Sequence, residues 1–186
     1  MRAALAAFAV RFALVLLLLL TWALGTGRYG GPDEPAHVLR SFAAAHGDLT
    51  GGPADPLPAG YRIVSVPERL ASGDPACYRL DARRTSACAA ASGGDERVRV
   101  ATSAGLTPPL YHLAVGAHVR LVGDPAATAW YRAMAALVHA VVVALAVHRA
   151  ARRGTLVACI AAMTPATWFV LGVVNPSSLE VALALL

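Results

Sequence analysis

Four apolar stretches divide the chain, and the first three are long enough to predict helices that cross a membrane. The first covers about residues 3–25 and contains one charged residue, Arg11. Since about 20 apolar residues suffice to span a bilayer, this stretch is long enough. The second and third cover about residues 126–147 and 155–174, and a fourth covers about residues 178–186. A cleaved signal peptide is the alternative for the first stretch, but the later stretches favour a permanent anchor.

The residues between the first two stretches, 26–125, follow shorter patterns. Apolar positions at helical spacing predict two amphipathic helices, over residues 35–47 and about residues 107–122. Residues 61–66 and 98–102 have strand-like composition and are candidates to pair. The fourth apolar stretch ends after less than half a crossing. We therefore predict an all-α polytopic membrane protein, a single truncated domain whose large first loop carries amphipathic helices.

Composition and charge support the membrane assignment and suggest an orientation. The chain is 57% hydrophobic and 15% charged, with a mean hydropathy of +0.56, which is beyond an ordinary soluble domain. The first loop contains ten arginines and ten acidic residues, so it is neutral. Five of the six arginines outside it flank the predicted spans on one side, namely Arg2, Arg11, Arg149, Arg152 and Arg153. The positive-inside rule then predicts a cytoplasmic N-terminus and an outward first loop. The net charge of +5 is a topology signal and does not indicate a nucleic-acid partner.

Two cysteines lie in the first loop, in the segment "CYRLDARRTSAC" that begins at Cys77 and ends at Cys88. Outside the cytoplasm, such a pair most often forms a disulfide, which would stabilise the loop by about 3 kcal/mol. A metal site is the alternative, but no histidine or third cysteine is close in sequence.

The segment "DEPAH" offers candidate chemistry just before the first amphipathic helix. Asp33 or Glu34 has the position of an N-cap, which would satisfy free backbone N–H groups. Glu34 and His37 also resemble half of a di-metal carboxylate motif, whose second copy is absent. A carboxylate here is also a candidate general base toward a hydroxyl. Arg40 has the chemistry to bind a phosphate, and Glu180, near the start of the fourth stretch, is either a functional intramembrane acid or an interfacial cap.

Four segments in this order resemble the bacterial domain-of-unknown-function family 2142, which comprises predicted polytopic membrane proteins related to the GT-C glycosyltransferases. The segments are "PDEPAHVLRSFAAAHGDL", the two-cysteine loop, "TPPLYHLAVGAHVRLVG" and "MTPATWFVLGVVNPSSLEVAL". No motif of a soluble nucleotide-binding protein or hydrolase accompanies them.

The resemblance implies an inverting transfer of sugar from a polyprenyl-phosphate donor to a cell-envelope acceptor, in the inner membrane. Asp33 would be the catalytic base and Glu34 its partner. Substrate-binding residues would be His37, Arg40, Tyr111 and His112, with Arg40 on the donor phosphate and the "TPPLYH" helix on the acceptor side. No cofactor is certain, and a divalent cation stays open. The alternatives are a non-catalytic protein that binds or moves an envelope lipid, and an inactive fragment.

Overall fold

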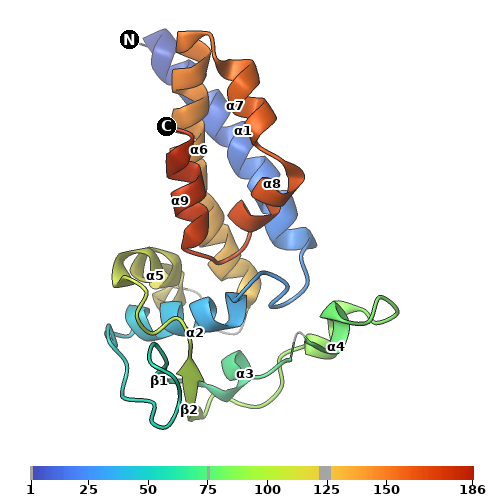
Figure 1. Ribbon diagram of the computed structural model, residues 1–186, viewed down its shortest axis with the longest axis vertical. Helices are drawn as coiled ribbons and strands as arrows, with labels where there is room; N and C mark the ends of the chain where they lie inside the picture. Colours follow the sequence, from blue (N-terminus) through green and yellow to red (C-terminus); the bar gives the residue numbers. More distant parts are fainter. Residues whose placement is uncertain (1, 75, 122–126) are drawn as a thin grey trace.

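The computed structural model describes residues 2–74, 76–121 and 127–186. Figure 1 shows two parts, an elongated bundle of helices and a smaller unit at one end of it. We call helices α1 and α6 to α9 the membrane bundle, and the described residues from Thr26 to Leu121 the loop domain. The candidate site lies where these two parts meet.

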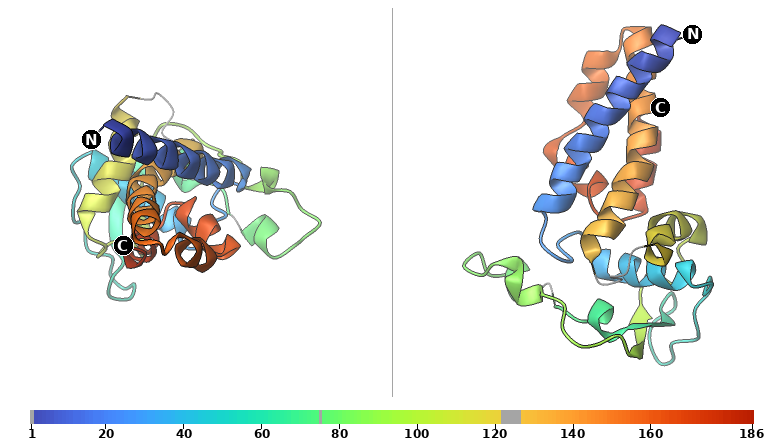
Figure 2. Two further views of the ribbon diagram at one scale, coloured as in Figure 1. Left: turned by 90° about the horizontal axis from the view of Figure 1, so that it is seen from above. Right: turned by 180° about the vertical axis from the view of Figure 1, so that it is seen from behind.

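Two long helices form the centre of the membrane bundle. α1 (Arg2–Gly25) and α6 (Thr128–Arg153) lie side by side along its length (Figure 2). Both are long and apolar enough to cross a membrane, and no other helix in the described part of the chain is. Leu19 of α1 packs in one apolar cluster with Ala136 and Ala140 of α6, whose small side chains allow close approach. The first two predicted spans are therefore helices of spanning length.

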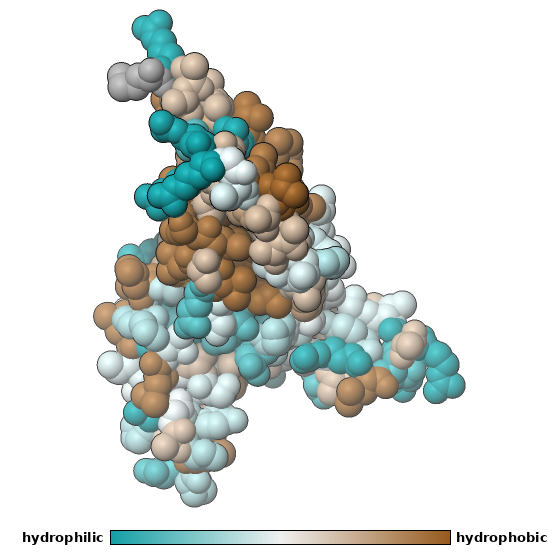
Figure 3. All heavy atoms as spheres, turned by 45° about the horizontal axis from the view of Figure 1, so that its top comes forward, coloured by the Kyte–Doolittle hydropathy of each residue, from teal (hydrophilic) through white to brown (hydrophobic). Residues whose placement is uncertain are grey.

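On the face that Figure 3 shows, the membrane bundle is largely apolar along its length and polar at the end far from the loop domain. α1 exposes leucines along its length, among them Leu14 and Leu17. The start of α1 and the end of α6, with Arg152 and Arg153 in its last turn, lie together at the end far from the loop domain (Figure 1). The arginines thus gather where the positive-inside interpretation needs them, and their cytoplasmic side stays a prediction.

The third predicted span, residues 155–174, is not one helix. It consists of α7 (Leu156–Ala162) and α8 (Pro165–Leu171), which follow each other down the bundle (Figure 1). The break has a local cause. Pro165 has no N–H to donate and its ring clashes with the preceding turn, so it begins a new helix that the Thr164 hydroxyl caps by accepting from the Thr167 N–H. α9 (Ser177–Ala184) then turns back along α6.

The loop domain places one helix between a second helix and a small sheet. α2 (Glu34–Ala45) packs on α5 (Pro109–Gly116) and on the antiparallel strands β1 (Arg62–Pro67) and β2 (Arg97–Thr102). The predicted pairing of the two strands is confirmed. The sheet that they form shows that the prediction of an all-α fold was wrong. Apolar residues of all these elements share one core, among them Val38, Phe42, Val64, Val66, Tyr111 and Val115. α5 continues as the 3₁₀ helix η2 (Ala117–Arg120), while the predicted end of that helix and the start of the second span, residues 122–126, lie outside the described residues.

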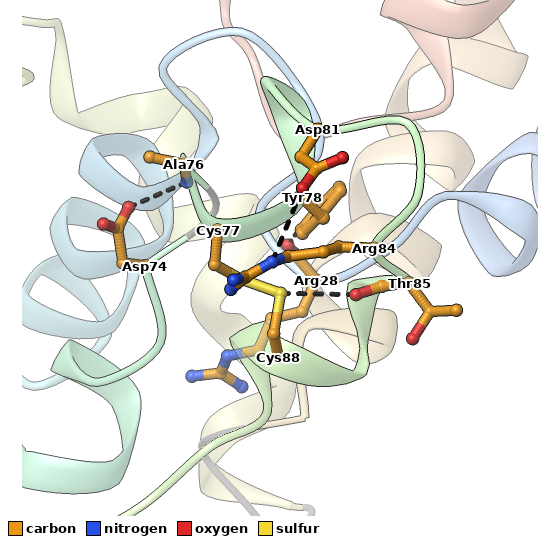
Figure 4. Close-up of a disulfide and its surroundings, with 9 residues drawn as sticks. All are labelled: Arg28, Asp74, Ala76, Cys77, Tyr78, Asp81, Arg84, Thr85 and Cys88. Carbon is orange, nitrogen blue, oxygen red and sulfur yellow. Dashed lines mark hydrogen bonds and ion pairs between the residues drawn. A yellow bond between two sulfur atoms is a disulfide. The ribbon is translucent and has the colours of Figure 1, made fainter.

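A disulfide-bridged arm extends sideways from the loop domain (Figure 1). After α3 (Glu68–Ala71), the arm carries α4 (Ala76–Arg79) and the 3₁₀ helix η1 (Ser86–Ala89). The structure joins Cys77 to Cys88 with an S–S distance of 2.02 Å (Figure 4). Besides the bridge, the Tyr78 hydroxyl donates to the Arg28 carbonyl at 2.7 Å and ties the arm to the segment that follows α1.

Candidate functional site

The two neighbouring acids at the start of α2 have opposite environments. Asp33 is exposed, and its backbone has a φ of 54°, in the left-handed region that aspartate enters more readily than most residues. It occupies the N-cap position, but its side chain makes no capping hydrogen bond. Interpreting Asp33 as a side-chain cap was therefore wrong, and its carboxylate stays open to solvent. Glu34, the next residue, is 0% exposed.

Glu34 forms a buried ion pair with Arg132 of α6. The Arg132 guanidinium donates to both carboxylate oxygens, each at 2.7 Å, and Arg132 is 2% exposed. The carboxylate also accepts the backbone N–H groups of Gly31 at 3.1 Å and Val174 at 3.2 Å. A buried charge is tolerated when it is paired and fully hydrogen-bonded, and the Glu34 carboxylate meets both conditions. Its role in the fold is therefore structural.

The remaining donors of Arg132 hold the end of α1. They contact the carbonyl oxygens of Ala23 at 3.1 Å, Gly27 at 2.6 Å and Thr26. We call Glu34, Arg132 and the backbone groups they bind the Glu34–Arg132 cluster. It connects α1, α2, α6 and the turn before α9 across the boundary of the two parts, and so fixes where Asp33 lies.

One turn further along α2, two histidines stack on each other. The rings of His37 and His112 have centroids 5.6 Å apart and planes 18° apart. The Ser41 hydroxyl donates to the His37 carbonyl at 2.8 Å and lies 2.9 Å from His112 Nδ1. Because the hydroxyl has one hydrogen, it must accept from His112 Nδ1–H, which leaves Nε2 as the acceptor. In the described part of the chain, His112 Nε2 and His37 Nδ1 are buried without a hydrogen-bond partner.

Burial keeps the side chains of His112, His37 and Tyr111 neutral. It lowers the pKa of His112 to about 3, and the charges of His37 and Arg40 act in the same direction. Burial also lowers the pKa of His37, although Asp33 and Glu34 oppose the change. Burial raises the pKa of the Tyr111 hydroxyl. The site therefore offers neutral hydrogen-bonding groups at physiological pH.

A pocket of about 550 Å³ opens beside His37, where α5 of the loop domain meets α6 and α9 of the bundle. We call it the membrane-side pocket. Its polar lining includes His37, Thr107 and the exposed Glu180. Its apolar lining comes from all three helices and comprises Leu110, Tyr111, Ala114, Val138, Leu179 and Leu183. Such a mainly apolar pocket with a few polar groups at one side suits an amphiphilic ligand.

Arg40 does not line the membrane-side pocket. It is 1% exposed and donates to the carbonyl oxygens of Asp48 at 3.0 Å and Leu49, which follow the end of α2. It lines a separate pocket of about 240 Å³, which we call the arginine pocket. Thr107 and Pro108 line both pockets, so the two adjoin.

The structure thus brings His37 and Tyr111 together in the lining of the membrane-side pocket, with His112 stacked on His37 and Arg40 in the adjoining pocket. Asp33 is one helical turn from His37, whose N–H donates to the Asp33 carbonyl at 3.2 Å, but it does not line either pocket.

Sequence reasoning missed Arg132. Its signal was an arginine inside a predicted span, which requires a buried partner. Among the described residues, no group of three or more His, Cys, Asp or Glu side chains could hold a metal ion.

Comparison with known proteins gives one family. The family described as "Predicted membrane protein (DUF2142)" matches residues 16–186, so every residue of the site lies inside the matched part. No curated protein and no solved structure matches the chain.

Proposed function

Since the chain belongs to domain-of-unknown-function family 2142, a family of predicted membrane proteins, we propose that it takes part in sugar transfer from a polyprenyl-phosphate donor. In this proposal it is a multi-pass protein of a bacterial inner membrane, with its N-terminus in the cytoplasm and the loop domain outside. The acceptor is a hydroxyl group of the cell envelope. The observation that carries the proposal is the membrane-side pocket, together with the exposed acid one turn from its edge.

The position of the pocket supports a lipid-linked substrate. Val138 and Leu179 reach it from the bundle helices α6 and α9, and α6 is one of the two helices long and apolar enough to cross a membrane, which supports an apolar side next to the bilayer. Its polar side is formed by residues of the loop domain, among them His37. A ligand with a long apolar chain can therefore keep that chain at the membrane and present its head group to the loop domain.

Asp33 has the properties of a general base in this proposal. It is exposed, lies one helical turn from the pocket residue His37 and carries no hydrogen bond that would occupy its carboxylate in the described structure. The acceptor oxygen would form a bond to the anomeric carbon while the bond from that carbon to the phosphate oxygen breaks. The acceptor proton passes to Asp33, and the phosphate leaves with the electron pair, which inverts the anomeric carbon.

The other predicted residues take supporting roles. Glu34 is a positioning residue, because its ion pair with Arg132 fixes the backbone from which Asp33 projects. His37 and Tyr111 line the pocket and would contact the substrate, whereas the buried His112 would act through the ring of His37. Arg40 would attract the donor phosphate from the adjoining pocket.

A second candidate function is binding or movement of an envelope lipid without chemistry. The observation that favours it is that Asp33 does not line the membrane-side pocket, which would then be a lipid site alone. The two candidates share the pocket and differ in whether Asp33 is needed.

Transfer from radiolabelled polyprenyl-phosphate sugars to envelope acceptors tests the proposal, with the full chain in its native membrane. Asp33→Asn keeps the size of the side chain and removes the base, so we expect a loss of about 100-fold or more in turnover. Asp55→Asn changes another exposed acid of the loop domain and should have no effect. Equal transfer by the Asp33→Asn variant and the unchanged protein would exclude Asp33 as the base and favour the lipid-binding function.

A further inference from the structure

Arg40 is a buried cation without an acidic partner. It is 1% exposed, and in the described part of the chain its guanidinium forms no ion pair, while its Nε has no hydrogen-bond partner. Asp48 lies near it, but that carboxylate accepts the Gly51 N–H at 2.7 Å. Buried charges in proteins are normally compensated by an opposite charge. An anion that enters from outside the chain would supply this compensation.

A second arginine lines the same pocket. Arg62, at the start of β1, is held there by the backbone around it. Gly51 and Gly105 leave room for its stem, since a Cβ at either glycine would come within 2.7 Å or 2.6 Å of Arg62 Cβ. Its guanidinium donates to the Tyr61 carbonyl at 3.0 Å, and the described residues offer it no ion pair. Two arginines therefore line one cavity of about 240 Å³.

The rest of the arginine pocket suits a small anion. Its other polar residues are Thr50 and Thr107, and the remaining lining is formed by Gly105 and by the apolar residues Leu49, Leu106, Pro108 and Pro109. No acidic residue is among the described residues that line it. Guanidinium and hydroxyl donors around a small cavity match the oxygens of a phosphate group, which accept several charge-assisted hydrogen bonds at once.

We propose that the arginine pocket binds a phosphate group through Arg40 and Arg62. The adjoining membrane-side pocket shares Thr107 and Pro108 with the arginine pocket. One molecule can therefore place an apolar chain in the membrane-side pocket and a phosphate in the arginine pocket. The binding of phosphate itself does not depend on sugar transfer. Only the assignment of that phosphate to a lipid-linked molecule rests on the proposed function.

Calorimetric titration of the purified full chain in detergent tests the site with three probes. Inorganic phosphate carries the anion alone, decyl phosphate carries the anion on an apolar chain, and an uncharged decyl glycoside carries the chain alone. The informative variant is Arg62→Gln, because Arg40 also holds the backbone of Asp48 and Leu49 and its removal endangers the fold. Arg99→Gln is the matched control, since Arg99 lies exposed on the neighbouring strand and lines neither pocket.

We expect decyl phosphate to bind more tightly than either other probe, and Arg62→Gln to weaken it about tenfold, the effect of losing one hydrogen bond to a charged group. Arg99→Gln should leave the affinity unchanged. Thermal unfolding of each variant without ligand shows that the fold is kept.

The result that would overturn the phosphate site is an absence of binding by both phosphate probes, or equal weakening by Arg62→Gln and Arg99→Gln. Binding of inorganic phosphate as tight as that of decyl phosphate would keep the phosphate site and refute its lipid-linked source. Phosphate binding without any sugar transfer would refute the proposed enzyme alone, so the two failures are distinguishable.

Discussion

Buried polar groups at the start of α2 have hydrogen-bond partners, whereas some of those further along the helix do not. At its start, both oxygens of Glu34 accept hydrogen bonds from Arg132, and two backbone N–H groups add to them. From the second turn onward, His37 and Arg40 each have a buried nitrogen without a partner in the described structure, as does His112 on the facing helix. Unpaired buried polar groups are costly, so a protein retains them where a ligand or water completes them.

This contrast separates scaffold from site. The Glu34–Arg132 cluster is complete without a ligand, and it connects the two parts of the molecule. Of the groups without partners, His37 lines the membrane-side pocket and Arg40 lines the arginine pocket, whereas His112 stacks on His37. Asp33 stands between the two regions, because its backbone is fixed by the cluster and its side chain is exposed.

The largest expected effect comes from breaking the Glu34–Arg132 cluster. Arg132→Met leaves the Glu34 carboxylate buried without its cation, so we expect a loss of about 3–5 kcal/mol in the free energy of unfolding. Denaturant unfolding in detergent measures it. The double change Glu34→Leu with Arg132→Met leaves no buried charge and should recover a large part of the loss. Failure of the single change to destabilise the protein would contradict the structural role.

The second effect concerns the packing that brings His112 to His37. Gly116 of α5 lies against α2, and a Cβ there would fall well inside contact distance of the Ser41 carbonyl group. Gly116→Ala should therefore push α5 from α2 and cost about 1–3 kcal/mol in unfolding free energy. Gly25→Ala is the matched control, since a Cβ at Gly25 meets nothing within 4 Å. Similar melting temperatures for the two variants would show that the helices do not pack as described.

The third effect is a pH dependence caused by burial of a neutral histidine. The pKa of His112 is about 3 in the folded protein, against a usual 6.5. As the pH falls below 6.5, the unfolded chain takes up a proton that the folded chain does not, so the unfolding free energy decreases. Between pH 7 and pH 5 the decrease is about 2 kcal/mol. His112→Asn should lose this part of the pH dependence, and parallel pH profiles of variant and unchanged protein would refute the assignment.

The smallest effect distinguishes backbone strain from capping at Asp33. Because φ is 54° and the side chain caps nothing, Asp33→Ala should cost about 1 kcal/mol through the backbone alone. Asp33→Asn should be nearly neutral, since asparagine also enters the left-handed region readily. Asp33→Gly should be no worse than Asp33→Asn. A loss with glycine as large as that with alanine would indicate that the carboxylate itself stabilises the helix.

Local patterns predicted much of the fold. Runs of apolar residues are sufficient to identify α1 and α6, and strand-like composition is sufficient for β1 and β2, because each signal lies within one segment. The break at Pro165 was also visible in the sequence, but a long apolar run outweighed it in our prediction of one span. The Cys77–Cys88 bridge, which the structure contains, was predicted from the short spacing of the two cysteines and from the predicted outward position of the loop.

Interactions between distant residues could not be predicted in the same way. Glu34 and Arg132 are 98 positions apart, and only the fold shows that they meet. The same holds for Arg40 and Arg62, which reach one pocket from a helix and a strand. For Asp33 and Glu34 the sequence shows two adjacent acids, and their burial decides which is structural.

Photolabelling tests most directly whether the membrane-side pocket holds the lipid part of the substrate. A polyprenyl phosphate with a photoreactive diazirine on its chain would be irradiated with the full chain in membranes, and the labelled peptides identified by mass spectrometry. We predict labels on residues 107–114 and 176–183, and their loss when unlabelled polyprenyl phosphate competes. Labels confined to the exposed face of α1, at Leu14 and Leu17, and unaffected by the competitor, would contradict a lipid site in this pocket.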